Sequence, residues 1–418
     1  MSRVLTGFLV FCASFLFTVL LFSALEYFDR SPPNVSLEIG SQVISKQDFK
    51  FSGKAKDFIS GISRIKVSLS QGQNTFSLFD IQLNGEKYHE FNIVVDDDIL
   101  NELSDGIVSL NIFVQDDSKN LNSVKTQYQL ILDNSPPRLS FIAYPENVDA
   151  NEAFLCIYEI QDDNLGEVFL RDGFNKYSVF RGFDYDENLG EKLYLSLHHG
   201  LEYITVTDKA GNILETRCPS RIIEGKPTQK VVEKDWFDDV FTEVSKSVKE
   251  LSRFYAKRLF DDLGLRFRGL SFNETIRVSG HGSIDRGVKE TILKNNVWFF
   301  GLKPTTLHCT FNFRIEKIKT VADKTVVFAD IGLGVKIVLV GLGQVYLKEG
   351  KTCAPEVVLG QTGEELGVFT FLRDKVVDPL SFFDTKTFVN NFVRVSAVAK
   401  QKLGGIPLSP IESAAIKR

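Results

Sequence analysis

The fold of this chain is decided by a stretch in its C-terminal third, Gly334-Val335-Lys336-Ile337-Val338-Leu339-Val340-Gly341-Leu342-Gly343. Aliphatic and β-branched residues run between glycine-containing breaks, which is the pattern of a buried strand bounded by turns. Shorter runs of the same kind occur at residues 325–328 and 357–359, and glycines separate them. Residues 266–395 are therefore predicted to form a compact antiparallel β-sheet domain, followed by a tail over residues 396–418.

Two segments of the N-terminal half occur twice. Ser31-Pro32-Pro33-Asn34-Val35-Ser36-Leu37 returns as Ser135-Pro136-Pro137-Arg138-Leu139-Ser140-Phe141, and in each copy two prolines precede a strand. Val114-Gln115-Asp116-Asp117-Ser118-Lys119-Asn120 is paralleled by Val206-Thr207-Asp208-Lys209-Ala210-Gly211-Asn212, where a strand enters a turn that Asp and Asn can cap. Stretches with a period of two lie between these markers.

This repetition predicts two tandem β-sandwich modules of immunoglobulin-like size, at residues 33–134 and 135–222. Binding modules and spacers both fit this pattern, and we favour a spacer that holds the C-terminal domain away from a membrane. The acidic runs at residues 96–98 and 116–117 are interpreted as turns rather than as paired catalytic carboxylates.

An amphipathic helix is predicted over residues 230–264. Its apolar residues recur at steps of three and four and therefore share one face: Phe237, Val240, Val244, Val248, Leu251, Tyr255, Leu259 and Leu263. We expect this face to pack on the chain's own domains, with partner binding as the alternative.

The N-terminus carries the pattern of a membrane anchor. Residues 4–25 contain no charged side chain, and at about 1.5 Å per helical residue such a run spans a hydrocarbon core of ~30 Å. Arg3 precedes the run, so its start should stay in the cytoplasm. Residues 1–30 are thus predicted to be a single-pass anchor in the inner (cytoplasmic) membrane, with the rest exported to the periplasm or cell exterior. A cleaved signal peptide is the alternative, although its apolar region is usually shorter.

The overall composition is that of a globular protein, with 43% hydrophobic and 25% charged residues. Its formal net charge of −5 gives no basic excess for nucleic-acid binding. The fold class predicted is mainly β: a transmembrane helix, two β-sandwiches, one amphipathic helix and an antiparallel sheet domain.

The C-terminal region resembles the lysostaphin-type (LytM-like) zinc peptidases that cut peptidoglycan cross-bridges. Four segments, taken in order, carry this resemblance: residues 326–329, residues 334–343, Val357-Val358-Leu359-Gly360-Gln361-Thr362-Gly363 and Val377-Asp378-Pro379-Leu380. The flanking order of membrane helix, two modules opening at Ser-Pro-Pro, helix and peptidase domain is also similar to one membrane-anchored branch of that family. The resemblance implies a LytM-like fold for residues 266–395.

The resemblance also implies where zinc ligands should lie. The family's "HxGxD" motif aligns with His308-Cys309-Thr310-Phe311-Asn312, so the His is kept and the Asp is replaced by the neutral Asn312. The second His motif falls on Gly367-Val368-Phe369-Thr370-Phe371, and the chain has no His after His308. A catalytic zinc needs three protein ligands and an open position. His308 and Asn312 are therefore interpreted as vestigial ligand positions, with no catalytic residue and no cofactor expected.

Other catalytic or metal sets are less well supported by the sequence. His281, His308, Cys309 and Cys353 match no ligand spacing, and neighbouring residues on a strand point to opposite faces. The pair His198-His199 is expected to be solvated at a strand end, and His89 is isolated. An oxidising compartment permits disulfides, and Cys156 with Cys218 is the pairing we predict within the second module. Cys309 with Cys353 is a second candidate, and buried free thiols are the alternative for all four.

These features predict a non-catalytic cell-envelope scaffold or regulator of peptidoglycan remodelling, a pseudoenzyme built on a metallopeptidase-like domain. Its expected partners are the membrane, through the N-terminal helix, and peptidoglycan or a peptidoglycan hydrolase. Two alternatives stay open: an active metalloendopeptidase with an unrecognised zinc-binding set, and a purely structural envelope protein.

Overall fold

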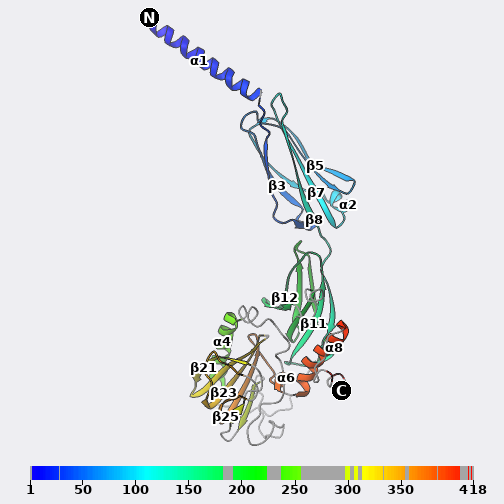
Figure 1. The fold of residues 1–418 in the computed structure, drawn as a ribbon, viewed down its shortest axis with the longest axis vertical. Coiled ribbons are helices and arrows are strands. Elements are labelled where there is room, and N and C mark those ends of the chain that lie inside the picture. Colours follow the sequence, from blue (N-terminus) through cyan, green and yellow to red (C-terminus); the bar gives the residue numbers. More distant parts are fainter. Residues whose placement is uncertain are drawn as a thin grey trace. The chain divides into compact units, whose positions relative to one another are not determined.

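The computed structural model describes residues 2–27, 29–181, 192–223, 237–255, 297–301, 306–308, 313–332, 334–353, 357–383 and 385–404, with residues 413 and 416. The fold is mainly β, as predicted. It divides into two compact units: Met1–Pro137 with Asp162–Glu167 and Val206–Leu214, and Arg138–Gln161 with Val168–Thr205 and Glu215–Arg418. Figure 1 shows the elements along the chain.

The first unit begins with helix α1, Ser2–Tyr27. Within the described residues, no helix combines the length and apolarity that crossing a membrane requires. The membrane anchor expected from the sequence therefore stays a prediction.

Two sheets follow α1 and enclose a shared core. The three-stranded sheet has the order β1-β3-β6 and the five-stranded sheet the order β2-β8-β7-β4-β5. Their bounds are β1 Asn34–Glu38, β2 Val43–Ile44, β3 Lys50–Lys56, β4 Ile62–Gln71, β5 Asn74–Glu86, β6 Tyr88–Val94, β7 Gly106–Asp116 and β8 Ser123–Leu132, with a short 3-10 turn at Lys46–Asp48 and helix α2 at Asp97–Glu102. Burial alternates along β3 and β7 with a period of two, and the inward residues of both sheets form one cluster.

The second module contains two four-stranded sheets. Their orders are β14-β15-β11-β9 and β13-β12-β16-β17, and β10 pairs with β18 in parallel. The bounds are β9 Arg138–Ala143, β10 Asn147–Asp149, β11 Ala153–Gln161, β12 Leu165–Asp172, β13 Asn175–Ser178, β14 Phe180–Arg181, β15 Leu193–His199, β16 Tyr203–Asp208, β17 Ile213–Arg217 and β18 Arg221–Ile223. Strands β11 and β15 are buried almost along their whole length, so both faces of their sheet are covered.

The C-terminal domain is built on an antiparallel sheet with the order β19-β25-β23-β22-β21-β24, to which β20 and β26 add beside β25. The bounds are β19 Val297–Gly301, β20 Thr306–His308, β21 Phe313–Val321, β22 Lys324–Gly332, β23 Val335–Val345, β24 Thr352–Cys353, β25 Val358–Leu372 and β26 Lys375–Val377. The stretch that decides the fold is thus β23. Gly341 bends it at φ +93°, where a Cβ would lie 2.2 Å from the carbonyl oxygen of Glu365.

One face of this sheet packs against helix α4, Phe237–Tyr255. The predicted apolar positions Val240, Val244 and Val248 are fully buried in a cluster that includes Val338 of β23 and Phe369 of β25. Lys319 of β21 donates to Glu243 of the helix at 2.7 Å. The helix therefore covers its own chain's sheet, as its amphipathic pattern favoured.

The other face of the sheet belongs to a larger cluster. Leu339 and Val368 share this cluster with Leu155 of β11 and Leu195 of β15. It also takes in four C-terminal segments, α6 Leu380–Phe383, α7 Thr385–Phe388, a π-helical turn at Val389–Val393 and α8 Arg394–Leu403. Helix α8 lies against β9 and β11 (Figure 1). The helix thus continues into the segment predicted as a tail, because Val395 and Ala399 bury an apolar face there.

Polar contacts reinforce this packing within the second unit. Arg373, in the turn between β25 and β26, donates to Glu202 at 2.9 Å and to the carbonyl oxygen of Leu197 at 2.6 Å. Asn391 of the π-helical turn donates to the carboxylate of Glu152 at 3.0 Å. Burial raises the pKa of Glu152 from 4.5 to about 7, against the lowering effect of this hydrogen bond.

The burial of Val338 allows a direct test of whether both faces of the sheet are covered. Val338→Asp places an unpaired charge at a position that is 0% exposed between the sheet and α4, and should lower the free energy of unfolding by at least about 3 kcal/mol. The matched control, Val357→Asp, changes a residue that is 40% exposed and should cost little. Chemical denaturation of the full chain, followed by circular dichroism, measures both. Equal effects of the two substitutions would contradict the two-faced burial.

Glu152 should make stability depend on pH. Because the folded pKa lies near 7 and the ordinary value is 4.5, the folded chain keeps a proton that the unfolded chain releases between these values. The free energy of unfolding should therefore fall as pH rises from about 4.5 to about 7, by at most about 3 kcal/mol from this group. Glu152→Gln should remove that part of the fall and be more stable than the wild type above pH 7. The exposed Glu146→Gln is the control, and parallel pH profiles for all three proteins would refute the assignment.

Candidate functional site

The predicted vestigial ligand His308 is the last residue of strand β20. It pairs with Val358 of β25, next to a shift in register, and is partly exposed. The second predicted position, Asn312, lies outside the described residues. The structure therefore places one of the two positions, and their vestigial role stays a prediction.

The segment that aligns with the second zinc motif lies in the middle of the sheet. Residues 367–371 belong to β25, which is flanked by β23 on one side and β19 on the other. Val368, Phe369, Thr370 and Phe371 are all 0% exposed. Val368 faces the large cluster shared with the second module, whereas Phe369 and Phe371 face α4. Whichever register is chosen, these side chains are core and supply no metal ligand.

Metal-ligating side chains gather elsewhere in the described part of the chain. Two groups of three carboxylates bring one oxygen from each residue within 4.8 Å of the others: Asp29 with Asp57 and Asp116, and Asp133 with Asp162 and Asp208. Neither group includes His308. Nitrogen and sulfur ligands, which zinc favours, are absent from both groups.

A buried charge network lies on the α4 side of the same sheet. Lys336 of β23 contacts both oxygens of Glu316, at 3.0 and 2.9 Å, and Asp330 of β22 at 2.9 Å. All three side chains are at most 3% exposed. Burial raises the pKa of Glu316 to about 7, with Lys336 opposing the rise. The signal in the sequence was Lys336 itself, the one charged residue within an apolar strand, and the sequence analysis left it without a role.

Fully buried ion pairs of this kind cost desolvation that their attraction must offset. The network satisfies the positive charge of Lys336 within the sheet, and it shares no residue with either described cluster of carboxylates. Its chemistry is that of a structural ion pair, because neither carboxylate is accessible to a substrate.

The expectation that the pair His198-His199 is solvated is wrong for His198, whereas His199 is partly exposed. His198 is 0% exposed, stacks on Phe154 with ring centres 5.4 Å apart, and contacts the hydroxyl of Ser196 at 2.7 Å. Burial lowers the pKa of His198 to about 3, so the ring is neutral. The reason is that the sheet of β11 and β15 is covered on both faces, which the sequence of the module alone does not reveal.

Ser196, His198 and Glu202 are the residue types of a hydrolytic triad, but they lack the required setting. The Nδ1 atom of His198 lies 3.7 Å from the Glu202 carboxylate, and all three side chains are at most 3% exposed. Arg373 neutralises Glu202 at 2.9 Å. A nucleophile needs access to its substrate, so this group is part of the core.

The cysteines show one close pair. Cys156 and Cys218 are free thiols whose sulfur atoms lie 2.8 Å apart, longer than the ~2.05 Å of a disulfide bond. Burial raises the pKa of the Cys156 thiol. Cys353 is disulfide-bonded, and Cys309, its predicted partner, lies outside the described residues.

Comparisons with known proteins identify no family. No family model matches the sequence, and no curated protein matches it. Among solved structures, the chain is similar to a Pseudomonas aeruginosa protein described as a peptidase M23, with 14% identity and a TM-score of 0.32 over 55% of this chain and 92% of the other. It is similar to Helicobacter pylori Csd3 with 9% identity and a TM-score of 0.21, over 79% and 70% of the two chains.

A tetra-tandem repeat from the extending region of a large adhesion protein is a third similar structure, with 14% identity and a TM-score of 0.22 over 46% and 49% of the two chains. With TM-scores this low, these likenesses carry no argument about what the chain does.

The Cys156–Cys218 pair gives a test of the predicted disulfide. To form a disulfide bond, the two sulfur atoms must move closer by less than about 1 Å. The bond should therefore form without rearranging β11. Non-reducing peptide mapping of protein from its native compartment should recover the two cysteines in one linked peptide. A Cys156→Ser variant provides the unlinked control. Alkylation of both thiols in the native protein would reject the pairing.

Proposed function

We propose that this chain is a non-catalytic scaffold or regulator of peptidoglycan remodelling in the cell envelope, built on a peptidase-like domain without a working zinc site. One observation carries the proposal. The segment of β25 that aligns with the family's second ligand motif is buried, and its residues at positions 368–371 are Val, Phe, Thr and Phe.

The chemistry of a zinc peptidase depends on what this strand lacks. The metal lowers the pKa of its bound water toward ~7 and polarises the scissile carbonyl, which requires three ligands and an open position. His308 offers one imidazole, and no other His follows it in the sequence. A covered strand of apolar side chains leaves no open position beside it.

The remaining regions are assigned supporting roles in the proposal. The uncharged residues 4–25 would anchor the chain in the cytoplasmic membrane, with the rest on the outer side of that membrane. The two β-sandwich modules, immunoglobulin-like by their sequence repeats, would act as a spacer. Peptidoglycan or one of its hydrolases would then meet the C-terminal domain as the partner.

Catalytic silence is the first consequence to test. The purified full chain should release no fragments from cross-linked peptidoglycan, with or without added zinc, because it has one of the three ligands. An active lysostaphin-type enzyme serves as the positive control for the assay. Zinc-dependent release that disappears in His308→Ala would restore the active-endopeptidase alternative.

A cellular test separates the regulator from a purely structural protein. His308→Ala should preserve the cellular role, whereas Val338→Asp should abolish it by unfolding the domain. Capture of the tagged chain from envelope extracts should enrich an intact peptidase or amidase, and the Val338→Asp variant should lose it. Equal recovery of hydrolases with both variants would favour the structural alternative.

A further inference from the structure

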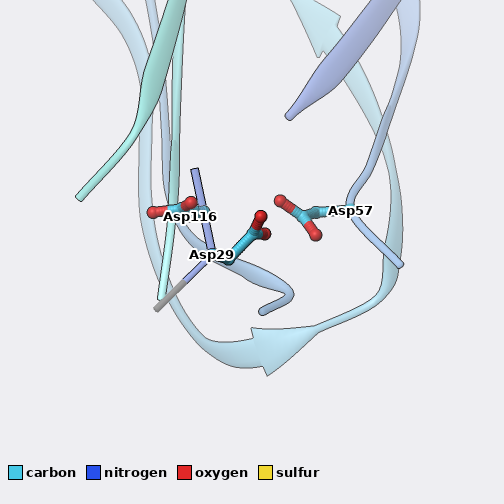
Figure 2. Close-up of side chains that lie close together, drawn as sticks. All are labelled: Asp29, Asp57 and Asp116. Carbon is cyan, nitrogen blue, oxygen red and sulfur yellow. The ribbon is translucent and has the colours of Figure 1, made fainter. Parts of the chain in front are cut away.

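Three carboxylates converge in the first unit from segments that lie far apart in the sequence. Asp29 follows helix α1, Asp57 follows strand β3, and Asp116 ends strand β7. Oxygen atoms of all three lie within 4.8 Å of one another, and Figure 2 shows the Asp29 and Asp57 carboxylates facing each other, with Asp116 on the other side of Asp29. Their exposed fractions are 5%, 6% and 0%. The cluster is therefore buried inside the module.

Among the described residues, no positive side chain forms an ion pair with these carboxylates. Asp29 accepts hydrogen bonds from the backbone N–H of Ser31 at 2.8 Å and from the Ser60 hydroxyl at 3.1 Å. Asp116 accepts from Ser118 and, at 2.6 Å, from the amide of Asn122. All of these donors are neutral, and no Lys or Arg in the described part of the chain forms an ion pair with any of the three carboxylates. Three buried like charges at this separation repel one another strongly.

Asp57 supplies an independent sign that a partner belongs at the centre. Its Oδ1 atom accepts from the backbone N–H groups of Ile59 and Ser60, at 2.9 and 3.1 Å. Its Oδ2 atom is buried and has no hydrogen-bond partner. A buried carboxylate oxygen left without a partner is costly, and in Figure 2 the Asp57 carboxylate points toward that of Asp29.

We propose that Asp29, Asp57 and Asp116 bind a divalent cation, and that the cation is Ca²⁺. The donor set consists of oxygen atoms alone, which selects hard cations over zinc or copper. Ca²⁺ accepts six to eight oxygen ligands with flexible geometry, including mono- and bidentate carboxylates on loops. Mg²⁺ demands a near-ideal octahedron and keeps several waters, so a compact cluster of three carboxylates favours it less.

The site would connect the start of the module to its loops. The backbone carbonyl oxygen of Asp29 accepts from Asn120 at 2.7 Å and from Asn122 at 3.0 Å, so the segment after α1 is already held by the turn after β7. Bound Ca²⁺ adds Asp57 and the turn after β3 to this junction. Because the three segments meet only in the folded module, the ion stabilises the folded state by mass action.

The second module repeats the arrangement. Asn212 donates to the carbonyl oxygen of Asp133 at 3.0 Å and to Asp208 at 2.7 Å, as Asn122 does to Asp29 and Asp116. Burial and the neighbouring Asp133 and Asp208 raise the pKa of Asp162, although hydrogen bonding to Asn164 opposes the rise. The proposal rests on the first cluster, where an oxygen atom is left unpartnered.

The test uses the purified full chain in detergent, freed of metal with a chelator and dialysed against CaCl₂. Asp57→Asn keeps the Oδ1 acceptor and removes the charge, so it should lose one equivalent of bound Ca²⁺ relative to the wild type. In the wild type, the site that this variant loses should bind Ca²⁺ with a Kd of about 10⁻⁵–10⁻³ M. The control, Asp117→Asn, makes the same change one residue away from the cluster, at an exposed position, and should keep the wild-type stoichiometry.

Thermal unfolding distinguishes metal binding from a structural role. Without Ca²⁺, Asp57→Asn should melt at or above the wild-type temperature, because one repelling charge is gone. With millimolar Ca²⁺, the wild type and Asp117→Asn should be stabilised, and both should melt at a higher temperature than Asp57→Asn. Equal Ca²⁺ stoichiometry in the wild type and Asp57→Asn would overturn the site, and tighter binding of Mg²⁺ than of Ca²⁺ would overturn the choice of ion.

Discussion

Strands β23 and β25 are covered on both faces, and much of the second unit follows from that burial. Valines and phenylalanines on one face pack against α4, while the alternate residues pack into the cluster shared with β11, β15 and the C-terminal helices. Removing this apolar surface from water on both faces stabilises the folded domain. It also leaves residues 368–371 of β25 with no exposed surface.

Because these faces are buried, charged and polar side chains on them need partners within the unit. Lys336 lies on a covered face and is neutralised by Glu316 and Asp330. Arg373 reaches the second module and pairs with Glu202, which would otherwise be an isolated buried charge. Glu152 has an amide, not a cation, as its partner, and burial accordingly raises its pKa. Each of these three side chains thus has a polar partner within the unit.

Local sequence patterns predicted the secondary-structure elements, but they did not predict which distant segments would pack against them. The apolar run of β23 and the three-and-four spacing of Val240, Val244 and Val248 are visible in the sequence and appear as a strand and a helix face. The burial of His198 is not visible, because it depends on Phe154 of the neighbouring strand β11, against which the imidazole stacks in the folded module. Asp116 was interpreted as a turn cap, and its bond to Ser118 fits that role. Its meeting with Asp29 and Asp57 arises only when distant loops fold together.

Under the proposed function, the peptidase-like domain holds no catalytic zinc, because the segment of β25 that should supply the second ligand is core. The direct test is the zinc content of the full chain. The chain is purified without chelators, and zinc is measured by inductively coupled plasma mass spectrometry. We expect no stoichiometric zinc in either the wild type or His308→Ala. One tightly bound zinc per chain that is lost in His308→Ala would contradict this expectation.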